Sequence, residues 1–192
     1  MSNSVSTAEQ RFEDFPVPSN RMGMWWFLAS EVVTFGGLFA SYLLFNIAHG
    51  GWEKFAQKNL FWIGTFNTYV LLTSSLTVVL ADHSARHKDR SGALRWIGVT
   101  LCLGLLFLGV KGYEYYAHIG HGVTPSTNLF FGFYYTMTGL HAIHVIGGLV
   151  TWIWVLKRVG LNDSYSAVRP VGLYWHFLGL VWIFLYPLMY TM

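Results

Sequence analysis

The stretch that decides the fold is MGMWWFLASEVVTFGGLFASYLLF, residues 22–45, which carries no charge apart from Glu31. A helix rises about 1.5 Å per residue, so this stretch is long enough to cross the hydrocarbon core of a bilayer. Glu31 lies ten residues after Arg21 and therefore well inside the membrane. An acidic group at that depth is costly unless it is protonated, partnered or turned away from lipid, which makes Glu31 a candidate functional residue.

The composition extends this interpretation to the whole chain. Hydrophobic residues make up 54% of the sequence and charged residues only 11%, whereas soluble domains carry about 25% charged residues. Lipid offers the backbone no hydrogen bonds, so long apolar runs must be helices. The sequence predicts an all-α integral membrane bundle in one domain, residues 22–192, after a polar segment, residues 1–21, that lacks the apolar core of a cleaved secretory signal. The five predicted helices span about 22–46, 61–81, 94–113, 129–156 and 172–191.

The basic residues predict the orientation, because cytoplasmic loops are enriched in Lys and Arg. The net charge of +3 is therefore a feature of topology and not a signal for nucleic acid. One side of the membrane would hold nine basic residues and the other three, which places the amino terminus in the cytoplasm and the carboxyl terminus on the outer face. The nine are Arg11, Arg21, Arg86, Lys88, Arg90, Arg95, Lys157, Arg158 and Arg169; the three are Lys54, Lys58 and Lys111.

Three histidines join Glu31 among the polar residues of the predicted spans: His141 and His144 in the fourth and His176 in the fifth. His141 and His144 are three residues apart, so they lie at neighbouring positions on one helix. Counted from the cytoplasmic ends, Glu31 and His144 have comparable depths. We expect Glu31 to form a hydrogen bond with a histidine of the fourth span or with a lipid headgroup; the bond to a histidine would leave no bare charge in the membrane.

The sequence does not predict a metal or haem site. Metal sites gather three or four ligands, and the chain offers one His-x-x-His pair in mid-membrane, no haem-attachment motif, and a single cysteine, Cys102. We therefore expect no catalytic centre in this chain, and its carboxylates are too few to form a proton path across the bundle. Lys111 and Glu114, three apart at the outer end of the third span, are expected to form an interfacial ion pair that anchors the helix.

Two classes of function remain open from the residues alone: an accessory subunit of a larger membrane complex, or a small transporter. Transporters are often built from inverted repeats and broken helices. This chain shows no internal repeat, and its only proline within a span is Pro187, near the end of the last one. The pattern favours the accessory subunit.

Five ordered segments resemble subunit III of haem-copper terminal oxidases. Together they cover most of the chain from residue 22 onward and include Glu31, Glu114, His141, His144 and His176. The segments are MWWFLASEVVTFGGLFASY (24–42), NTYVLLTSSLTVVLADHSAR (67–86), KGYEYYAH (111–118), STNLFFGFYYTMTGLHAIHVIGG (126–148) and GLYWHFLGLVWIFLYPLMY (172–190). At position 111 the resemblance implies a neutral polar residue, so Lys111 departs from the pattern of that family.

The resemblance implies a non-redox subunit of a complex that reduces oxygen to water and pumps protons. Such a subunit packs against catalytic subunit I, with subunit II and a small subunit IV as further partners, and binds phospholipid. It supports assembly, stability and sustained proton uptake, while haem and copper belong to the partner subunits. The chain is similar to the short five-helix type of the bacterial cytoplasmic membrane. Cytochrome c is the favoured electron donor; a quinol oxidase or a nitric oxide reductase accessory subunit is the alternative.

Overall fold

The computed structural model describes residues 19–50, 52 and 61–190, and these residues form helices joined by short turns. Each of the five described helices is long and apolar enough to cross a membrane. The prediction of an all-α five-helix bundle is confirmed. The predicted segment 1–21 lies outside the described residues except for its last three, which begin the first helix. The helices are α2 (Ser19–His49), α4 (Phe61–Arg86), α5 (Arg90–Gly120), α6 (Leu129–Asn162) and α7 (Val168–Tyr190).

The helices are longer than the apolar runs that predicted them, because a helix continues into polar residues once it leaves the hydrocarbon layer. The predicted connection 82–93 is an example, because most of it is helical. Only three residues separate α4 from α5. Lys88 turns the chain with a left-handed φ of 56°, and Asp89 caps α5 by accepting a hydrogen bond from the Gly92 backbone N–H at 3.1 Å.

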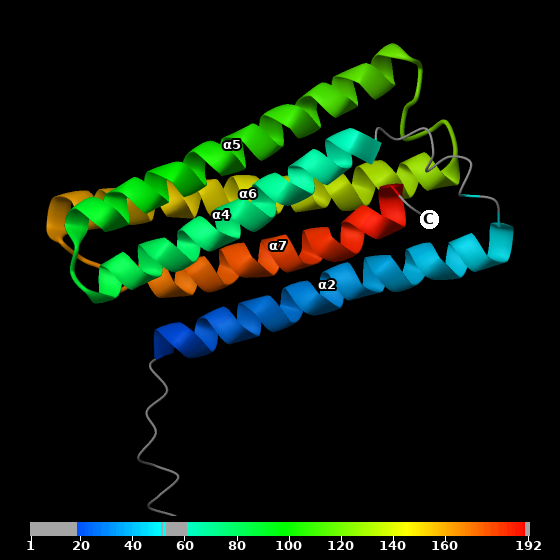
Figure 1. Cartoon of the computed structure of the whole chain (residues 1–192). Coiled ribbons are helices and arrows are strands. Elements are labelled where there is room, and N and C mark those ends of the chain that lie inside the picture. Colours follow the sequence, from blue (N-terminus) through cyan, green and yellow to red (C-terminus); the bar gives the residue numbers. More distant parts are fainter. Residues whose placement is uncertain (1–18, 51, 53–60, 191–192) are drawn as a thin grey trace, which may run out of the picture.

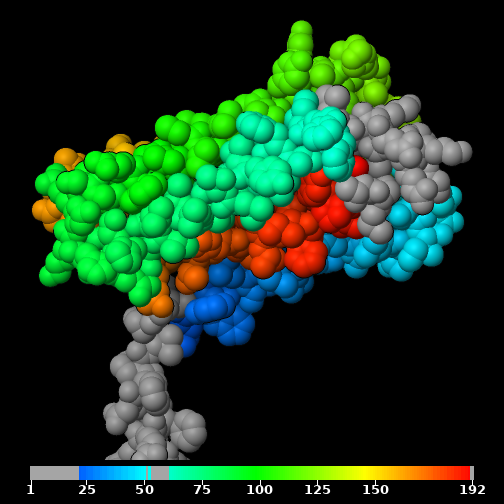
Figure 2. Space-filling model, viewed as in Figure 1, coloured from blue at the N-terminus to red at the C-terminus, as the bar shows by residue number. Residues whose placement is uncertain are grey.

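Four of the helices form a ring and the fifth lies outside it. Helices α4 and α6 each pack against both α5 and α7, which closes the ring, and α2 packs against α7 and α6. Figure 1 shows α2 running alongside this ring. In the space-filling view, α2 lies along the edge of the bundle beside α7, and much of its surface faces outward (Figure 2).

Trp175 of α7 is the side chain on which the ring closes. It is 1% exposed, and its indole N–H donates a hydrogen bond to Ser74 Oγ of α4 at 3.0 Å. Gly104 of α5 and Gly148 of α6 make room for the Trp175 indole: a Cβ atom at either position would lie 2.9 Å from a carbon of that indole. Small residues of this kind let membrane helices approach closely, because van der Waals packing drives their association.

Apart from Lys111, the lysines and arginines of the described helices and turns lie toward one end of the bundle. The α4–α5 turn, the α6–α7 connection and the start of α2 all lie at this end (Figure 1). Arg90 joins the two turns by a hydrogen bond to the Gly160 carbonyl and a 3.6 Å ion pair with Asp163. The arrangement agrees with the predicted charge asymmetry, although the direction of the bundle across a membrane stays a prediction. Arg11, Lys54 and Lys58 lie outside the described residues.

Candidate functional site

The first polar centre joins α2 to α6 through Glu31 and His144. Glu31 Oε2 lies 3.0 Å from His144 Nε2, and their side chains are 14% and 17% exposed. The ring is held from two directions: its Nδ1 lies 2.8 Å from the Leu140 carbonyl oxygen, and Phe35 contacts it edge to face at a centroid distance of 5.4 Å. The centre therefore places a carboxyl group and an imidazole in direct contact between two helices.

The contact to Leu140 determines what the other ring nitrogen can do. A carbonyl oxygen only accepts hydrogen bonds, so His144 Nδ1 carries the proton in that contact. In a neutral ring, Nε2 is then a bare acceptor. The Glu31 oxygen lies 3.0 Å from this nitrogen, but no hydrogen bond joins the two groups: Glu31 Oε2 has no hydrogen-bond partner among the described residues. The carboxyl group and the imidazole therefore meet at ion-pair distance across the α2–α6 interface.

The other two predicted histidines do not join this centre. His141 is completely buried and lies on the neighbouring face of α6, where its ring packs 5.3 Å from that of Trp182 and 5.8 Å from that of Phe107. Within the described part of the chain, neither of its ring nitrogens has a hydrogen-bond partner. His176 is partly exposed on α7. The spacing of three between His141 and His144 separates them by about 60° around the helix axis, which sends them to different neighbours.

The second polar centre contains Lys111 and Glu114. Lys111 Nζ lies 2.9 Å from Glu114 Oε2, as an i,i+3 pair, but the side chains are only 3% and 0% exposed. The pair therefore forms as expected, and it faces into the bundle and not outward from it. Sequence gives the position of a residue along a helix but not the face of the helix that carries it; the role of the pair as an interfacial anchor stays a prediction.

Two tyrosines complete the second centre, and sequence reasoning missed both. Tyr134 of α6 donates a hydrogen bond to Glu114 Oε1 at 2.9 Å, and Tyr190 of α7 donates to the same carboxylate at 2.6 Å. Tyr134 belongs to the aromatic run 130–135, which resembles an interfacial belt in the sequence. The available signal was the opposite charge pair itself, because two charges in a span need polar partners.

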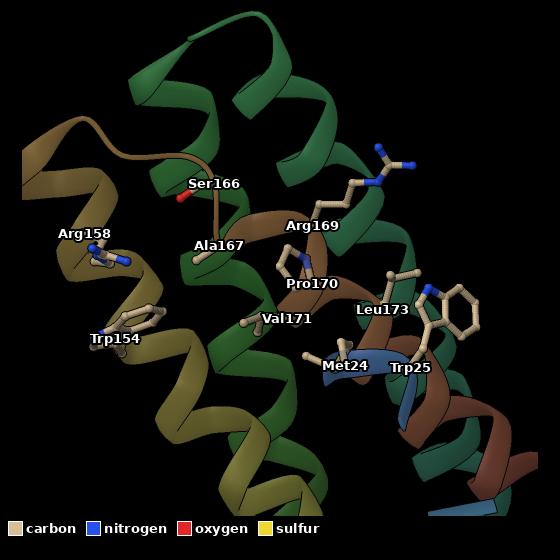
Figure 3. A pocket seen from close by; sticks show the side chains of 10 residues that line it. All are labelled: Met24, Trp25, Trp154, Arg158, Ser166, Ala167, Arg169, Pro170, Val171 and Leu173. Carbon is tan, nitrogen blue, oxygen red and sulfur yellow. The ribbon is translucent and has the colours of Figure 1, made fainter. Parts of the chain in front are cut away.

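A cavity opens at the basic end of the bundle (Figure 3). It has a volume of about 580 Å³ and lies between the start of α2, the end of α6 and the start of α7. Arg158 and Arg169 line it from different helices, and the Arg158 guanidinium lies 4.7 Å from the centre of the Trp154 ring. Met24 and Leu173 supply an apolar wall. The cavity thus combines two cations with a hydrophobic surface.

The polar groups of the described helices are not arranged as a metal site. Among residues 19–50, 52 and 61–190, no three His, Cys, Asp or Glu side chains are grouped closely enough to hold a metal ion. The Glu31 carboxyl group lies beside a ring nitrogen of His144. The Glu114 carboxylate is bonded to the Lys111 ammonium and to two phenol groups. What these two centres offer is hydrogen bonding and charge pairing between helices.

Five apolar helices joined by buried polar pairs define the class: a multi-pass α-helical membrane protein. A family model described as cytochrome c oxidase subunit III matches residues 14–192. The chain belongs to the cytochrome c oxidase subunit III family, so it is a subunit of a terminal oxidase complex with other oxidase subunits as partners.

Individual relatives agree over most of their length. The cytochrome c oxidase subunit 3 of Thermostichus vulcanus is 35% identical, over 89% of this chain and 86% of the relative. A Mycobacterium leprae protein named as a probable cytochrome c oxidase subunit 3 is 38% identical, over 85% of this chain and 83% of the relative. A Staphylococcus epidermidis protein is 34% identical, over 99% and 96%, and is named as a probable quinol oxidase subunit 3. The relatives therefore include subunits of both oxidase types.

Proposed function

We propose that this chain is the non-redox subunit III of a bacterial haem-copper oxidase that reduces oxygen to water and pumps protons. In this role it packs against catalytic subunit I in the cytoplasmic membrane, contacts subunit II and a small subunit IV, and sustains assembly and proton uptake. The observation that carries the proposal is the family match across residues 14–192. The polar residues support it, because both polar centres link helices of this chain and neither resembles a ligand set.

Copurification tests this proposal directly. The tagged chain, extracted from its native membrane in mild detergent, is expected to bring with it a large subunit that contains haem and copper. After dissociation, the isolated chain should show no stoichiometric haem or copper, because no ligand set for them is expected in it. Metal in the isolated chain would contradict the non-redox role, and purification of the chain alone would favour a free-standing transporter.

We propose cytochrome c as the electron donor, with quinol as the second candidate. Relatives named as cytochrome c oxidase subunits support the first, and the Staphylococcus epidermidis relative supports the second. The donor is bound by other subunits, so the purified complex must answer the question. Oxygen uptake with reduced cytochrome c, together with a Cys-x-x-x-Cys copper motif in subunit II, would support cytochrome c; uptake with quinol alone would support a quinol oxidase.

The cavity at the basic end supports the proposed binding of phospholipid. Juxtamembrane Lys and Arg attract anionic headgroups with about 1 kcal/mol each, and the apolar wall beside Arg158 and Arg169 suits an acyl chain. The two arginines suit the phosphate group of a phospholipid, and the apolar wall suits its hydrocarbon part. The start of α2 forms one wall, so such a lipid would also seal the contact between α2 and the ring (Figure 3).

Replacing both arginines should release this lipid. We expect Arg158→Gln combined with Arg169→Gln to lower the affinity for phosphatidylglycerol about tenfold or more, because two headgroup contacts are lost. Native mass spectrometry of the complex, with titrated lipid, measures the change. Lys157→Gln is the matched control, since it removes a neighbouring exposed cation that does not line the cavity. Equal lipid retention in all three proteins would refute the assignment of this cavity.

A further inference from the structure

The centre around Lys111 and Glu114 lies where three helices meet, and the function proposed above does not use it. Lys111 and Glu114 come from α5, Tyr134 from α6 and Tyr190 from α7. We propose that these four residues form a closed ion-pair lock. In this lock Lys111 is the obligatory counter-charge of Glu114. The lock holds its protons in place and does not relay them.

The hydrogen bonds of the centre match a charged lysine and a charged glutamate. An ammonium has three donors and no acceptor, and Lys111 Nζ has three acceptors within reach: Glu114 Oε2 at 2.9 Å, Tyr190 Oη at 2.6 Å and Tyr134 Oη at 3.1 Å. A carboxylate only accepts, and Glu114 receives the hydroxyl protons of both tyrosines. Each tyrosine oxygen accepts from the lysine and donates to the glutamate, so the network is complete.

Aromatic rings surround the ammonium and support the same charge state. The ring centres of Tyr115 and Trp182 each lie 5.4 Å from Lys111 Nζ, beside Tyr134 and Tyr190, which meet the lysine through their hydroxyl oxygens. The negative faces of aromatic rings attract a cation, and the attraction is larger when the cation is removed from water. A neutral amine would gain little from this cage. The cage and the hydrogen bonds therefore both favour the ionic form.

A complete network of this kind holds protons where they are. A relay needs a vacant acceptor at one end and a free donor at the other, whereas every donor and acceptor described above is already used within the four residues. The Glu31–His144 pair differs, because Glu31 Oε2 lies 3.0 Å from His144 Nε2 without a hydrogen bond between them. Of the two centres, the one around Lys111 and Glu114 is therefore the one that hydrogen bonds fix in place.

Tyr190 extends the lock to a fourth helix. A Cβ atom at Gly64 of α4 would lie 2.8 Å from the Tyr190 ring, so the glycine allows the ring to lie against the α4 backbone. The hydroxyl of the same side chain reaches Lys111 and Glu114 on α5. The end of α7 is therefore held to α4 by packing and to α5 by the ion pair, which requires all four helices to keep their register.

The lock predicts strong coupling between the two charges. Removing one partner of a buried pair leaves an uncompensated charge and is strongly destabilising, whereas replacing both by neutral groups is often tolerated. We expect Lys111→Gln and Glu114→Gln each to lower the melting temperature of the detergent-solubilised full chain by about 10 °C. The double variant should melt within about 3 °C of the wild type, because its two amides can bond to each other and to the tyrosines.

Two further proteins make the test decisive. Lys157→Gln, which removes an exposed lysine, should melt like the wild type, and Tyr190→Phe, which keeps the ring on Gly64 but loses the hydroxyl, should fall between the wild type and the single variants. A double variant that is no more stable than the weaker single variant, or that fails to fold, would overturn the coupling. The melting experiment uses the chain alone, so its result does not depend on the proposed oxidase function.

The proton-holding part of the inference rests on the proposed function and is tested in the oxidase complex. There the double variant should keep the wild-type ratio of protons pumped per electron. A lower ratio in an intact, fully assembled complex would show that Lys111 or Glu114 carries protons, and would overturn this part of the inference. Failure of the wild-type chain to copurify with an oxidase would instead refute the proposed function and leave the melting result standing.

Discussion

Gly104→Val is expected to remove most of this chain from the purified oxidase complex. A Cβ atom at Gly104 would lie 2.7 Å from Leu149 Cδ2 and 2.9 Å from the Trp175 ring. Leu149 can rotate, but Trp175 cannot move away easily, because its N–H is bonded to Ser74 and its other ring edge meets Gly148. Overpacking a filled core lowers the free energy of unfolding by about 1–3 kcal/mol, and by more where the neighbouring side chains cannot move. We therefore expect Gly104→Val to lower it by about 3 kcal/mol or more.

Gly109→Val provides the matched control on the same helix. Gly109 is exposed on α5, and a Cβ atom there would meet no other atom within 4 Å. Both variants add the same side chain to α5, so a general effect of valine on the helix would appear in both. Densitometry of the chain in the purified complex, and its melting temperature, measure the difference. Equal retention of the two variants would show that Trp175 does not close the ring as described.

Glu31→Gln is expected to leave initial turnover of the complex near the wild-type rate and to shorten the time over which activity is sustained. A glutamine amide can donate a hydrogen bond to His144 Nε2, so the contact between α2 and α6 survives, but the ionisable carboxyl group beside the imidazole is lost. Glu31→Leu should have the larger effect on assembly. It leaves the half-buried His144 ring without its polar partner on α2.

Oxygen uptake followed over many turnovers, together with subunit stoichiometry, separates these outcomes. Ser30→Ala is the control, because Ser30 precedes Glu31 on the exposed side of α2 and bonds only to its own helix at Phe27. Complete loss of the first turnover in Glu31→Gln would argue for a direct catalytic role and against the supporting role proposed above. Unchanged sustained activity in both Glu31 variants would show that the Glu31 carboxyl group has no part in that role.

The candidate sites were predictable from sequence to different degrees. Glu31 and His144 were placed at a common depth by counting residues along two apolar runs, and the structure brings them to 3.0 Å. The functional meaning of this contact stays a prediction. Lys111 and Glu114 were paired correctly by their spacing, but the sequence did not show that they face into the bundle. Their partners Tyr134 and Tyr190 are 20 and 76 residues from Glu114 in the chain, so local patterns contained no sign of that contact.

The sequence by itself determined the number of helices, their approximate limits and the depth of each polar group. These follow from local quantities: the length of an apolar run, the rise of a helix, and the need of a backbone in lipid to satisfy its own hydrogen bonds. The tertiary structure decided which way each helix faces. That rotation depends on how side chains interlock between helices, as Trp175 does with Gly104 and Gly148. It turned His144 toward Glu31 and His141 toward Trp182, and it enclosed Lys111 and Glu114 within the bundle.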